Sequence, residues 1–388
     1  MIVALPVKNE AERIGDCLRA LACQQHSRSH EILLLLNNCT DDTASVVRDL
    51  APGLPVPVHL LDVALPTERS NAGHARRLAM RHAAERAGAG GVLLTTDADG
   101  RVAPDWIAAN LAAIRNGADA VAGRAEIDPD EARRIPAHLH ADDALECAYA
   151  ERLDEIDCLV TPDAADPWPR HNEDSGASIA VTWAAFRRAG GIPACALGED
   201  RGFIARLRRV DAAIRHAPEV RVVVSGRIEG RALGGMADTM RRRIVRQDEW
   251  IDDRLEPALH RLRRAVLRAR FRAARERMVC PASLARQLRL PSPLLAASLA
   301  RPFFGAGWDT VEARSPMLRR HAVRRADLAR QTEIAEAILA RLRARSANAP
   351  ATMVLLTDAT RGPSVCCGGK PLDRACSSAS ARLSSVPQ

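Results

Sequence analysis

The sequence has few aromatic residues, few lysines and no long apolar run. Phe, Trp and Tyr make up 3% of the 388 residues, which argues against the stacking surfaces that bind single-stranded nucleic acid. No apolar run approaches the roughly 20 residues that a membrane-spanning helix needs. The chain opens directly on the apolar segment 2–7, so we expect no signal peptide. We therefore expect a cytoplasmic protein with no nucleic-acid partner.

Cysteine and basic residues add two further limits. The ten cysteines include no pair with zinc-ligand spacing and a matching partner pair, which in a chain of this length indicates reduced thiols. The net charge is +8 and the pI is about 9.3, a balance that suits an anionic ligand or an anionic surface. Only Lys8 and Lys370 are lysines, and such an arginine bias also follows from the coding composition of a genome.

Short continuous apolar runs alternate with amphipathic segments along the first part of the chain. Pro57 places one of these strands at a sheet edge. This alternation predicts an α/β fold with a mostly parallel sheet covered by helices on both faces. The predicted strands are 2–7, 32–36, 56–61, 92–95 and 118–122, and the predicted helices are 14–21, 69–87 and 106–114.

After Pro129 the pattern is less regular. Beyond residue 226 the chain is helical and rich in arginine, and from 346 it is rich in Ser, Gly and Cys without a period. We predict three parts: a nucleotide-binding catalytic domain (1–228), a helical C-terminal region (229–345) and a disordered tail (346–388). The other predicted elements are helices at 137–157, 183–189, 201–209 and 325–345, a loop at 161–173, and strands at 175–181, 213–215 and 220–225.

Acidic residues follow three of the predicted strands: Glu10, the pair Asp41/Asp42, and the pair Asp97/Asp99. In an open α/β sheet the carboxyl ends of parallel strands meet at the ligand-binding edge. A divalent cation that also binds a phosphate would offset the free-energy cost of placing several carboxylates close together there. The alternative for Asp97 and Asp99 is that they cap the following helix or form a turn.

Five motifs in order resemble those of family 2 glycosyltransferases, over residues 1 to about 235. Residues 3–10 resemble the opening strand with Pro-x-x-Asn-Glu, and 38–43 resemble an S-x-D-x-T segment. Residues 71–77 are similar to G-x-x-x-A-R-N, with Arg77 where Asn is commoner. Asp97-Ala98-Asp99 matches D-x-D, and Gly198-Glu199-Asp200 resembles the later E-D motif. Each motif alone is weak, but five in order are a strong signal.

The resemblance implies a GT-A fold, with a mixed, mostly parallel sheet, and transfer of a sugar from a nucleoside diphosphate. It implies that Glu10 and Asp41 hold the nucleoside, that Asp97 contacts the ribose, and that Asp99 holds Mg²⁺ or Mn²⁺. It implies Asp200 as the general base, with Glu199 as its rival. The other donor-binding residues that it implies are Pro6, Asn9, Gly73, Arg76, Gly176, Ala177 and Arg227.

Several of these roles have alternatives. Arg76 is either near the phosphates or a solvated helix arginine, and Asp200 is either the base or the N-cap of helix 201–209. A basic group on the leaving diphosphate is expected around Ser225–Arg227 or at Arg231. His216 is a second candidate, with a plain surface histidine as the alternative. The basic helices near 240–278 either lie on an anionic membrane at its inner face or present a solvated surface.

The resemblance thus implies a metal-dependent hexosyltransferase, with inversion as the expected outcome because Asp200 can act as a base. The Q-x-x-R-W signature of the processive members is absent, and residues Arg246–Trp250 resemble it only in part. The acceptor stays open between a small molecule, a glycan and a lipid-linked molecule, as does a retaining outcome. The alternatives are a non-catalytic nucleotide-binding or interaction protein of the same fold, and a sugar-phosphate nucleotidylyltransferase. The second should have a Gly-rich loop after the first strand, which the chain lacks.

Overall fold

The computed structural model describes residues 1–26, 29–227 and 236–347. Within the described ranges, residues 1–344 form one compact unit. The predicted boundary at 228/229 and Arg231 lie outside the described residues. The predicted tail also lies outside them, apart from its first two residues, which end helix α14 (Leu328–Ala347).

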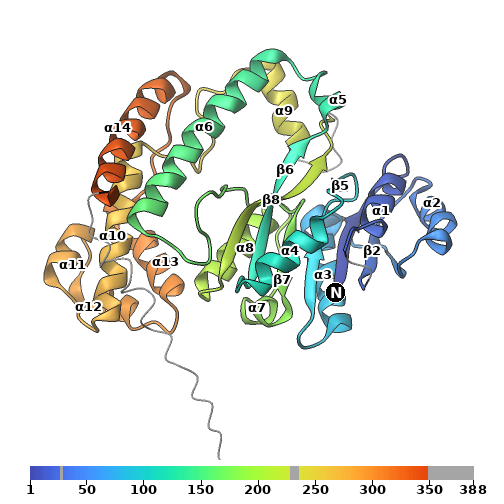
Figure 1. Cartoon of the computed structure of the whole chain (residues 1–388), viewed down its shortest axis with the longest axis horizontal. Coiled ribbons are helices and arrows are strands. Elements are labelled where there is room, and N and C mark those ends of the chain that lie inside the picture. The colour runs from blue at the N-terminus through green and yellow to red at the C-terminus, as the bar shows by residue number, and fades with distance from the viewer. Residues whose placement is uncertain (27–28, 228–235, 348–388) are drawn as a thin grey trace, which may run out of the picture. The chain divides into compact units, whose positions relative to one another are not determined.

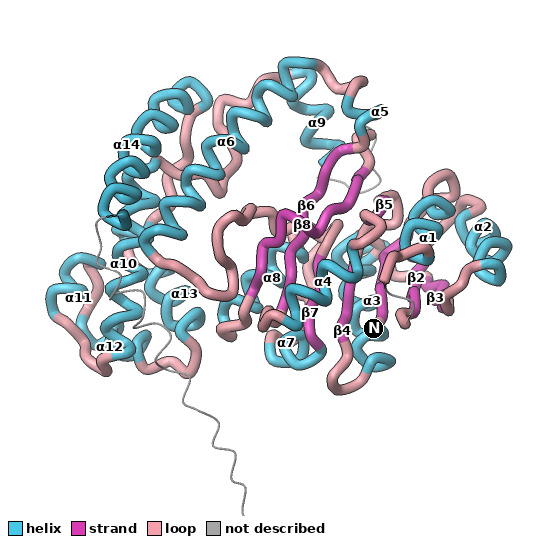
Figure 2. Tube along the Cα trace, viewed as in Figure 1, coloured by secondary structure: helices cyan, strands magenta, loops and turns pink. Residues whose placement is uncertain are grey.

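An eight-stranded sheet runs through the N-terminal part (Figures 1 and 2). Its order is β3-β2-β1-β4-β7-β6-β8-β5. The first four strands are mutually parallel, β7 is antiparallel to both of its neighbours, and β6 and β8 are parallel. The predicted mixed, mostly parallel sheet is confirmed, with β3 at an edge as Pro57 indicated. The strands are β1 (Ile2–Val7), β2 (Glu31–Asn37), β3 (Val58–Val63), β4 (Val92–Thr95), β5 (Arg101–Val102), β6 (Ala120–Ile127), β7 (Ile179–Thr182) and β8 (Ile214–Val224).

Helices cover both faces of the sheet because its strands are apolar on both sides. In β1, Val3 and Leu5 pack into one buried cluster, and Ile2 and Ala4 into the other, as the two-residue period of a strand requires. The first cluster includes side chains of α1 (Ile14–Ala22), α2 (Thr43–Leu50) and α4 (Trp106–Arg115). The second includes side chains of α3 (Ala72–Ala87), α7 (Trp183–Arg188) and α8 (Glu199–Arg209).

Three predicted elements need correction. The strand expected at 175–181 is only Ile179–Thr182, because residues 175–178 form a turn before it. The two strands expected at 213–215 and 220–225 are the single strand β8. Gly123 of β6 pairs with Ala217 and Arg124 with Arg221, so the register skips residues 218–220, where Pro218 has no N–H to donate. The short strand β5, opposite the end of β8, was not predicted.

The C-terminal part is helical, as predicted. Figure 1 shows the long helix α6 (Ala137–Val160) leading from the region of β6 to α10 (Ala258–Glu276) and α14. Tyr149, Leu153 and Ile156 of α6 pack in one buried cluster with residues of those two helices. A second cluster joins α10 to α11 (Ala282–Leu288), α12 (Ser292–Leu299) and α13 (Phe304–Arg314). The remaining helices are α5 (Pro129–Ala132) and α9 (Met236–Val245). Among the described helices, none is long and apolar enough to cross a bilayer.

Candidate functional site

The three acidic clusters follow adjacent strands of the sheet. β2, β1 and β4 are neighbours and parallel, so their carboxyl ends lie along one edge. Glu10 follows β1, Asp41 follows β2, and Asp97 and Asp99 follow β4. The structure therefore brings the clusters to the same edge, where open α/β sheets bind ligands.

Thr43 joins the segments that follow β1 and β2. The backbone N–H of Glu10 donates to Thr43 Oγ1 (2.8 Å), and the Asp41 carboxylate accepts from the backbone N–H of Ala11 (3.1 Å) and of Thr43 (3.1 Å). Asn9, at a left-handed φ of 55°, accepts from the Thr40 backbone N–H (2.8 Å). These contacts fix the backbone around Glu10 and Asp41. Pro6 lies in β1, half-buried, opposite Leu35 of β2.

Arg227, just beyond β8, bridges two of the acidic clusters. Its guanidinium donates to both carboxylate oxygens of Glu10 (2.6 and 3.0 Å) and lies 3.0 Å from Asp99 Oδ2. Burial lowers the pKa of Arg227, but the hydrogen bonds to Glu10 and the charge of Asp99 outweigh it, so the pKa lies above its ordinary value. A cation therefore already joins Glu10 to Asp99.

Asp99 lies where negative charge is concentrated. Burial, followed by the charge of Asp97 and then that of Glu10, raises its pKa to about 6 against the opposing effect of Arg227. A nearby divalent cation stabilises the ionised form of such a carboxylate. No three acidic, His or Cys side chains within the described ranges could hold a metal ion by themselves. Mg²⁺ is usually held by one or two carboxylates together with substrate phosphates, so Asp99 and Asp97 fit a metal that arrives with a diphosphate.

Arg76 is the buried centre of the site and is 4% exposed. Its guanidinium donates to Asp97 Oδ1 (2.5 Å) and Glu199 Oε1 (3.0 Å), and one nitrogen donates to both Thr95 Oγ1 and the Gly176 carbonyl oxygen (2.9 Å each). Burial lowers the pKa of Arg76, but the charges of Asp97 and Glu199 outweigh it and hold the pKa above its ordinary value. The alternative of a solvated helix arginine is wrong, because this side chain joins β4, α8 and residue 176.

Gly73 and Gly176 are required by close contacts of the protein itself. A Cβ at Gly73 would lie 2.1 Å from the carbonyl oxygen of Cys195, and a Cβ at Gly176 would lie 2.7 Å from the Arg76 guanidinium. Gly73 lets α3 approach residues 195–196, and Gly176 leaves room for Arg76. Their predicted contacts with the donor stay predictions, as does that of the buried Ala177.

Glu199 and Asp200 open helix α8 with different surroundings. Glu199 is buried and paired to Arg76. Asp200 is partly exposed; one of its carboxylate oxygens accepts from the Gly176 N–H (2.9 Å) and the other from the Arg201 N–H (2.7 Å). The helix begins at Glu199 with Gly198 as its N-cap, so the N-cap alternative for Asp200 is wrong. Of the two carboxylates, that of Asp200 is the more accessible.

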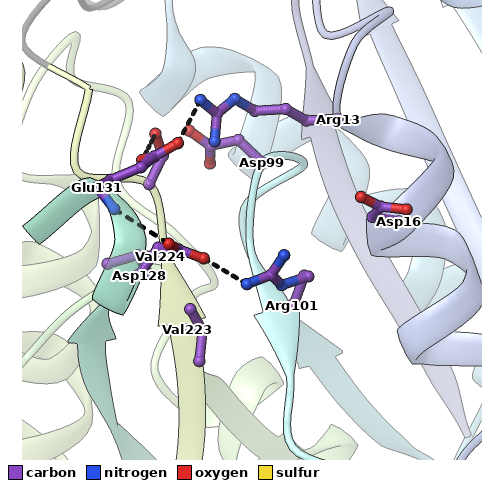
Figure 3. A pocket seen from close by; sticks show the side chains of 9 residues that line it. Arg13, Asp16, Asp99, Arg101, Asp128, Glu131, Val223 and Val224 are labelled. Atoms are coloured by element: carbon purple, nitrogen blue, oxygen red, sulfur yellow. Dashed lines mark hydrogen bonds and ion pairs between the residues drawn. The ribbon is translucent and has the colours of Figure 1, made fainter.

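A polar pocket adjoins Asp99 on the side of α1 and β5 (Figure 3). Arg13 donates to Glu131 (2.7 Å), and Glu131 also accepts from the Gly226 N–H (2.6 Å). Arg101 pairs with Asp128 at the other end of the pocket. Arg13 and Glu131 were not among the predicted site residues. Arg13 could have been found from its position three residues after Glu10, whereas Glu131 lies in the short helix α5, which no motif marks.

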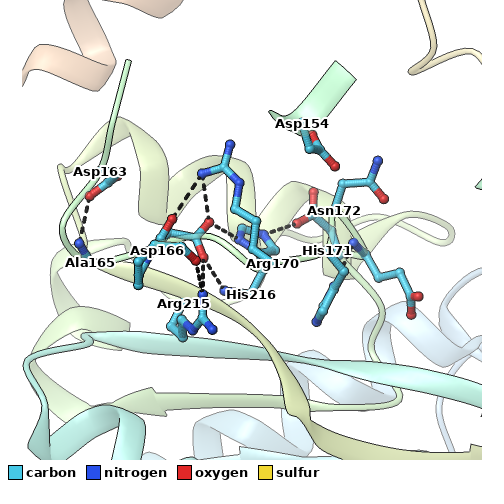
Figure 4. Close-up of polar contacts among 12 residues, drawn as sticks. Asp154, Asp163, Ala165, Asp166, Arg170, His171, Asn172, Arg215 and His216 are labelled. Carbon is cyan, nitrogen blue, oxygen red and sulfur yellow. Dashed lines mark hydrogen bonds and ion pairs between the residues drawn. The ribbon is translucent and has the colours of Figure 1, made fainter. Parts of the chain in front are cut away.

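His216 belongs to a second polar cluster, away from the acidic edge (Figure 4). It is 6% exposed, so the surface-histidine alternative is wrong. Its Nδ1 lies 2.8 Å from Asp166 Oδ2, and its Nε2 lies 3.2 Å from Asp174 Oδ1. Along the sheet it is opposite Ala122 of β6, three strands from β4. The other charged or titratable groups around it include Asp154, Arg170, His171, Arg208 and Arg215.

The His216 cluster ties the predicted loop 161–173 to β8 and α8. Burial lowers the pKa of His216, but its hydrogen bonds to Asp166 and Asp174 outweigh burial and raise it above 6.5. Burial raises the pKa of Asp174, but Arg208 and His216 outweigh it and hold the pKa well below its ordinary value. Burial, with the charge of His216, lowers the pKa of His171 to about 4. The cluster holds the segment that enters the Gly176 turn.

A comparison with known protein families gives a match over the N-terminal part of the chain. Residues 2–168 match the family described as Glycosyl transferase family 2, which confirms the resemblance over that segment. The α/β sheet described above is the mixed, mostly parallel sheet flanked by helices that the motifs predicted. A search of curated proteins gave no match.

Among solved structures, the chain is similar to the mannosyltransferase PcManGT from Pyrobaculum calidifontis in complex with GDP-Man and Mn²⁺ (18% identity, 92% of this chain and 79% of that chain, TM-score 0.42). It is also similar to TarS 1–349 from S. aureus in complex with UDP-GlcNAc (14% identity, 88% and 91%, TM-score 0.45). A third similar structure is glucosyl-3-phosphoglycerate synthase from Mycobacterium tuberculosis in complex with Mg²⁺ and UDP (13% identity, 63% and 77%, TM-score 0.37).

Proposed function

We propose, from the match of residues 2–168 to glycosyl transferase family 2, that this protein is a glycosyltransferase. It transfers a sugar, a hexose in our proposal, from a nucleoside diphosphate to an acceptor hydroxyl, with Mg²⁺ or Mn²⁺ as cofactor. The acceptor is a small molecule, a glycan or a lipid-linked molecule. The family match covers β1, β2 and β4 and the segments after them, which contain Glu10, Asp41, Asp97 and Asp99.

The observation that carries this proposal is the Arg76 network. One buried guanidinium holds Asp97, at the end of β4, and Glu199, at the start of α8, and it donates to the Gly176 carbonyl between them. Residues 97, 176 and 199 are far apart in sequence, and Asp200 is in turn bonded to Gly176. This arrangement supports one site in which donor-binding and catalytic carboxylates are held in fixed relation, as oriented reactants require.

The donor side of the site follows from the acidic edge. Glu10 and Asp41, with Pro6 and Asn9 beside them, would accept hydrogen bonds from the nucleoside, and Asp97 would accept from the ribose. Arg227 would turn from Glu10 and Asp99 toward the diphosphate, because guanidinium groups bind phosphate oxygens bidentately. Gly73 would lie beside the diphosphate, and Gly176 and Ala177 beneath the sugar.

Asp99, with Asp97 beside it, would hold the metal ion. When bound, the ion would neutralise the negative charge that develops on the leaving diphosphate. The raised pKa of Asp99 reflects burial and neighbouring carboxylates, the kind of environment that a divalent cation stabilises.

Asp200 would remove the proton from the acceptor hydroxyl. Its partly exposed carboxylate is oriented by the Gly176 N–H at 2.9 Å, and a positioned carboxylate of this kind serves as a general base. A base that activates the acceptor for direct attack gives inversion at the anomeric carbon. Glu199 is the weaker candidate because its carboxylate is buried against Arg76.

The test is a turnover assay with a panel of UDP-, GDP-, ADP- and dTDP-sugars and Mn²⁺, in which release of the nucleoside diphosphate is measured. We expect one nucleotide class to be used, and turnover to be lost when the metal is chelated. Nucleotide binding without turnover, also in the presence of small alcohols and glycans as acceptors, would favour a non-catalytic binding protein. Pyrophosphate release from a nucleoside triphosphate and a sugar phosphate would instead indicate a nucleotidylyltransferase.

A further inference from the structure

Two groups of arginines along helix α10 and its C-cap, Arg277, differ in their surroundings, while Arg268 and Arg272 lie over the Phe304 ring and Arg275 donates to backbone carbonyls. Arg261 and Arg264 point into the protein, where they pair with carboxylates such as Asp157 (2.7 Å) and Glu256 (2.8 Å). Arg263, Arg270 and Arg277 are exposed and recur every seven residues, so they share one face of the helix. None of these three forms an ion pair within the described ranges. One face of α10 thus carries structural ion pairs, and another carries uncompensated charge.

Two aliphatic side chains project at the end of that charged face. Met278 is 92% exposed and Val279 is 48% exposed. They form the turn between α10 and α11, in which Met278 has a left-handed φ of 52°. Contiguous exposed apolar surface, unlike a single exposed apolar side chain, marks contacts with a partner or a membrane, and Met278 and Val279 are consecutive residues.

A groove between α10 and α11 adjoins these two residues. Arg270 and Arg277 lie at its α10 side, and Leu284 and Gln287 at its α11 side, with Ala273, Ala274 and Val279 among its lining. Arg270 donates to Gln287 Oε1 (2.5 Å) across the groove. Cationic side chains therefore lie next to apolar ones along this groove, where Val279 is exposed and Ala274 and Leu284 are buried.

The charge of this part of the chain is strongly one-sided. Residues 258–289 contain ten arginines and a single acidic residue, Glu276. This formal excess of nine positive charges exceeds the +8 of the whole chain, although Arg261 and Arg264 pair with carboxylates outside the segment. The basic character of the protein is therefore concentrated on α10, α11 and the turn between them, which Figure 1 labels.

We propose that this surface, defined by Arg263, Arg270, Arg277, Met278, Val279, Arg286 and Arg289 and called here the α10–α11 corner, docks on an anionic phospholipid bilayer. Arginines attract anionic head groups, while Met278 and Val279 enter the interface between head groups and acyl chains. A nucleic acid would use the charge but has no role for two exposed aliphatic side chains. The proposal goes beyond the glycosyltransferase activity, and its test does not depend on that activity.

The test is co-sedimentation of the full chain with vesicles of phosphatidylcholine alone or with 30% phosphatidylglycerol, at about 0.1 M salt. We expect binding only to the anionic vesicles. Because each basic residue near such a surface adds about fivefold to partitioning, the variant R270Q/R277Q should bind roughly twentyfold more weakly. The variant M278S/V279S should bind at least fivefold more weakly.

The control R48Q/R115Q removes two exposed arginines from α2 and α4 and has the same net charge as R270Q/R277Q. It should bind within about twofold of the unmodified protein. The proposal is overturned if the protein ignores anionic vesicles, or if the control weakens binding as much as R270Q/R277Q. It is also overturned if M278S/V279S binds unchanged, since the surface would then be a general polyanion site.

Discussion

A Cβ atom at Gly176 would lie 2.7 Å from the guanidinium carbon of Arg76. The two residues are 100 positions apart, and Arg76 also donates to the Gly176 carbonyl oxygen at 2.9 Å. The Arg76 guanidinium therefore occupies the space that a side chain at position 176 would need. Through this contact α3 is joined to the turn whose N–H orients Asp200.

Gly176→Ala should destabilise the protein and disturb the site. The added methyl group would displace a buried guanidinium held by Thr95, Asp97 and Glu199, and overpacking of this kind costs about 2 kcal/mol. Urea unfolding measures the change. Gly53→Ala is the matched control, because nothing lies within 4 Å of a Cβ there. Equal stability of the two variants would contradict the packing role of Gly176.

Arg227→Gln should have opposite effects on two ligands. Without the guanidinium, Glu10 and Asp99 lose a cation 2.6 and 3.0 Å away, so Mn²⁺ alone should bind at least tenfold more tightly. Nucleoside diphosphate binding with saturating Mn²⁺ should weaken, because a phosphate partner is lost. Calorimetric titration measures both. Arg101→Gln, which removes the partner of Asp128, should change neither, and a parallel change in both affinities would count against the bridge.

Asp200→Asn should separate catalysis from binding. Asparagine keeps an oxygen that can accept from the Gly176 N–H but does not take a proton, so turnover should fall by about 10²- to 10⁴-fold. Nucleotide affinity and unfolding free energy should stay nearly unchanged. Glu199→Gln should behave differently and lower stability by about 3 kcal/mol, because it breaks a buried ion pair with Arg76. Retained turnover in Asp200→Asn would remove Asp200 from the mechanism.

His216→Gln should cost more stability at low pH than at high pH. The pKa of His216 is raised above 6.5 in the folded protein, so its charged form stabilises the fold fully below pH 6.5, and this contribution is lost as pH rises through the folded pKa. Asp166 and Asp174, whose pKa values are lowered, stay ionised throughout. Urea unfolding should show a loss of about 2 kcal/mol at pH 5.5 and less than half of it at pH 9. An equal loss at both pH values would mean that the charge of His216 does not matter.

The sequence predicted the parts of the fold that local pattern encodes. The continuous apolar runs of β1, β2 and β4 and the acidic residues after them placed three clusters at one sheet edge, and the structure has them there. The family motifs pointed to Arg76 and Gly176 separately. Their contact could not be predicted, because it depends on how α3 packs against a turn 100 residues later.

Other features were missed for physical reasons. Pro218 divides the apolar pattern of β8, so one bulged strand reads as two. The pairing of His216 with Asp166 and Asp174 depends on where a proline-containing loop folds back, which no periodicity encodes. The unpaired arginines of α10 could be told from the paired ones only after the positions of α6 and α13 were known.

The central claim, that Asp97 and Asp99 form a nucleotide–metal site, is tested most directly by thermal unfolding with nucleoside diphosphates and Mn²⁺. The account predicts that one nucleotide stabilises the protein only when Mn²⁺ is present, by about 2.7 kcal/mol at a hundredfold excess over its dissociation constant. It predicts that Asp99→Asn abolishes this metal-dependent stabilisation while leaving the fold intact. No stabilisation by UDP, GDP, ADP or dTDP with Mn²⁺, or an equal one in Asp99→Asn, would contradict it.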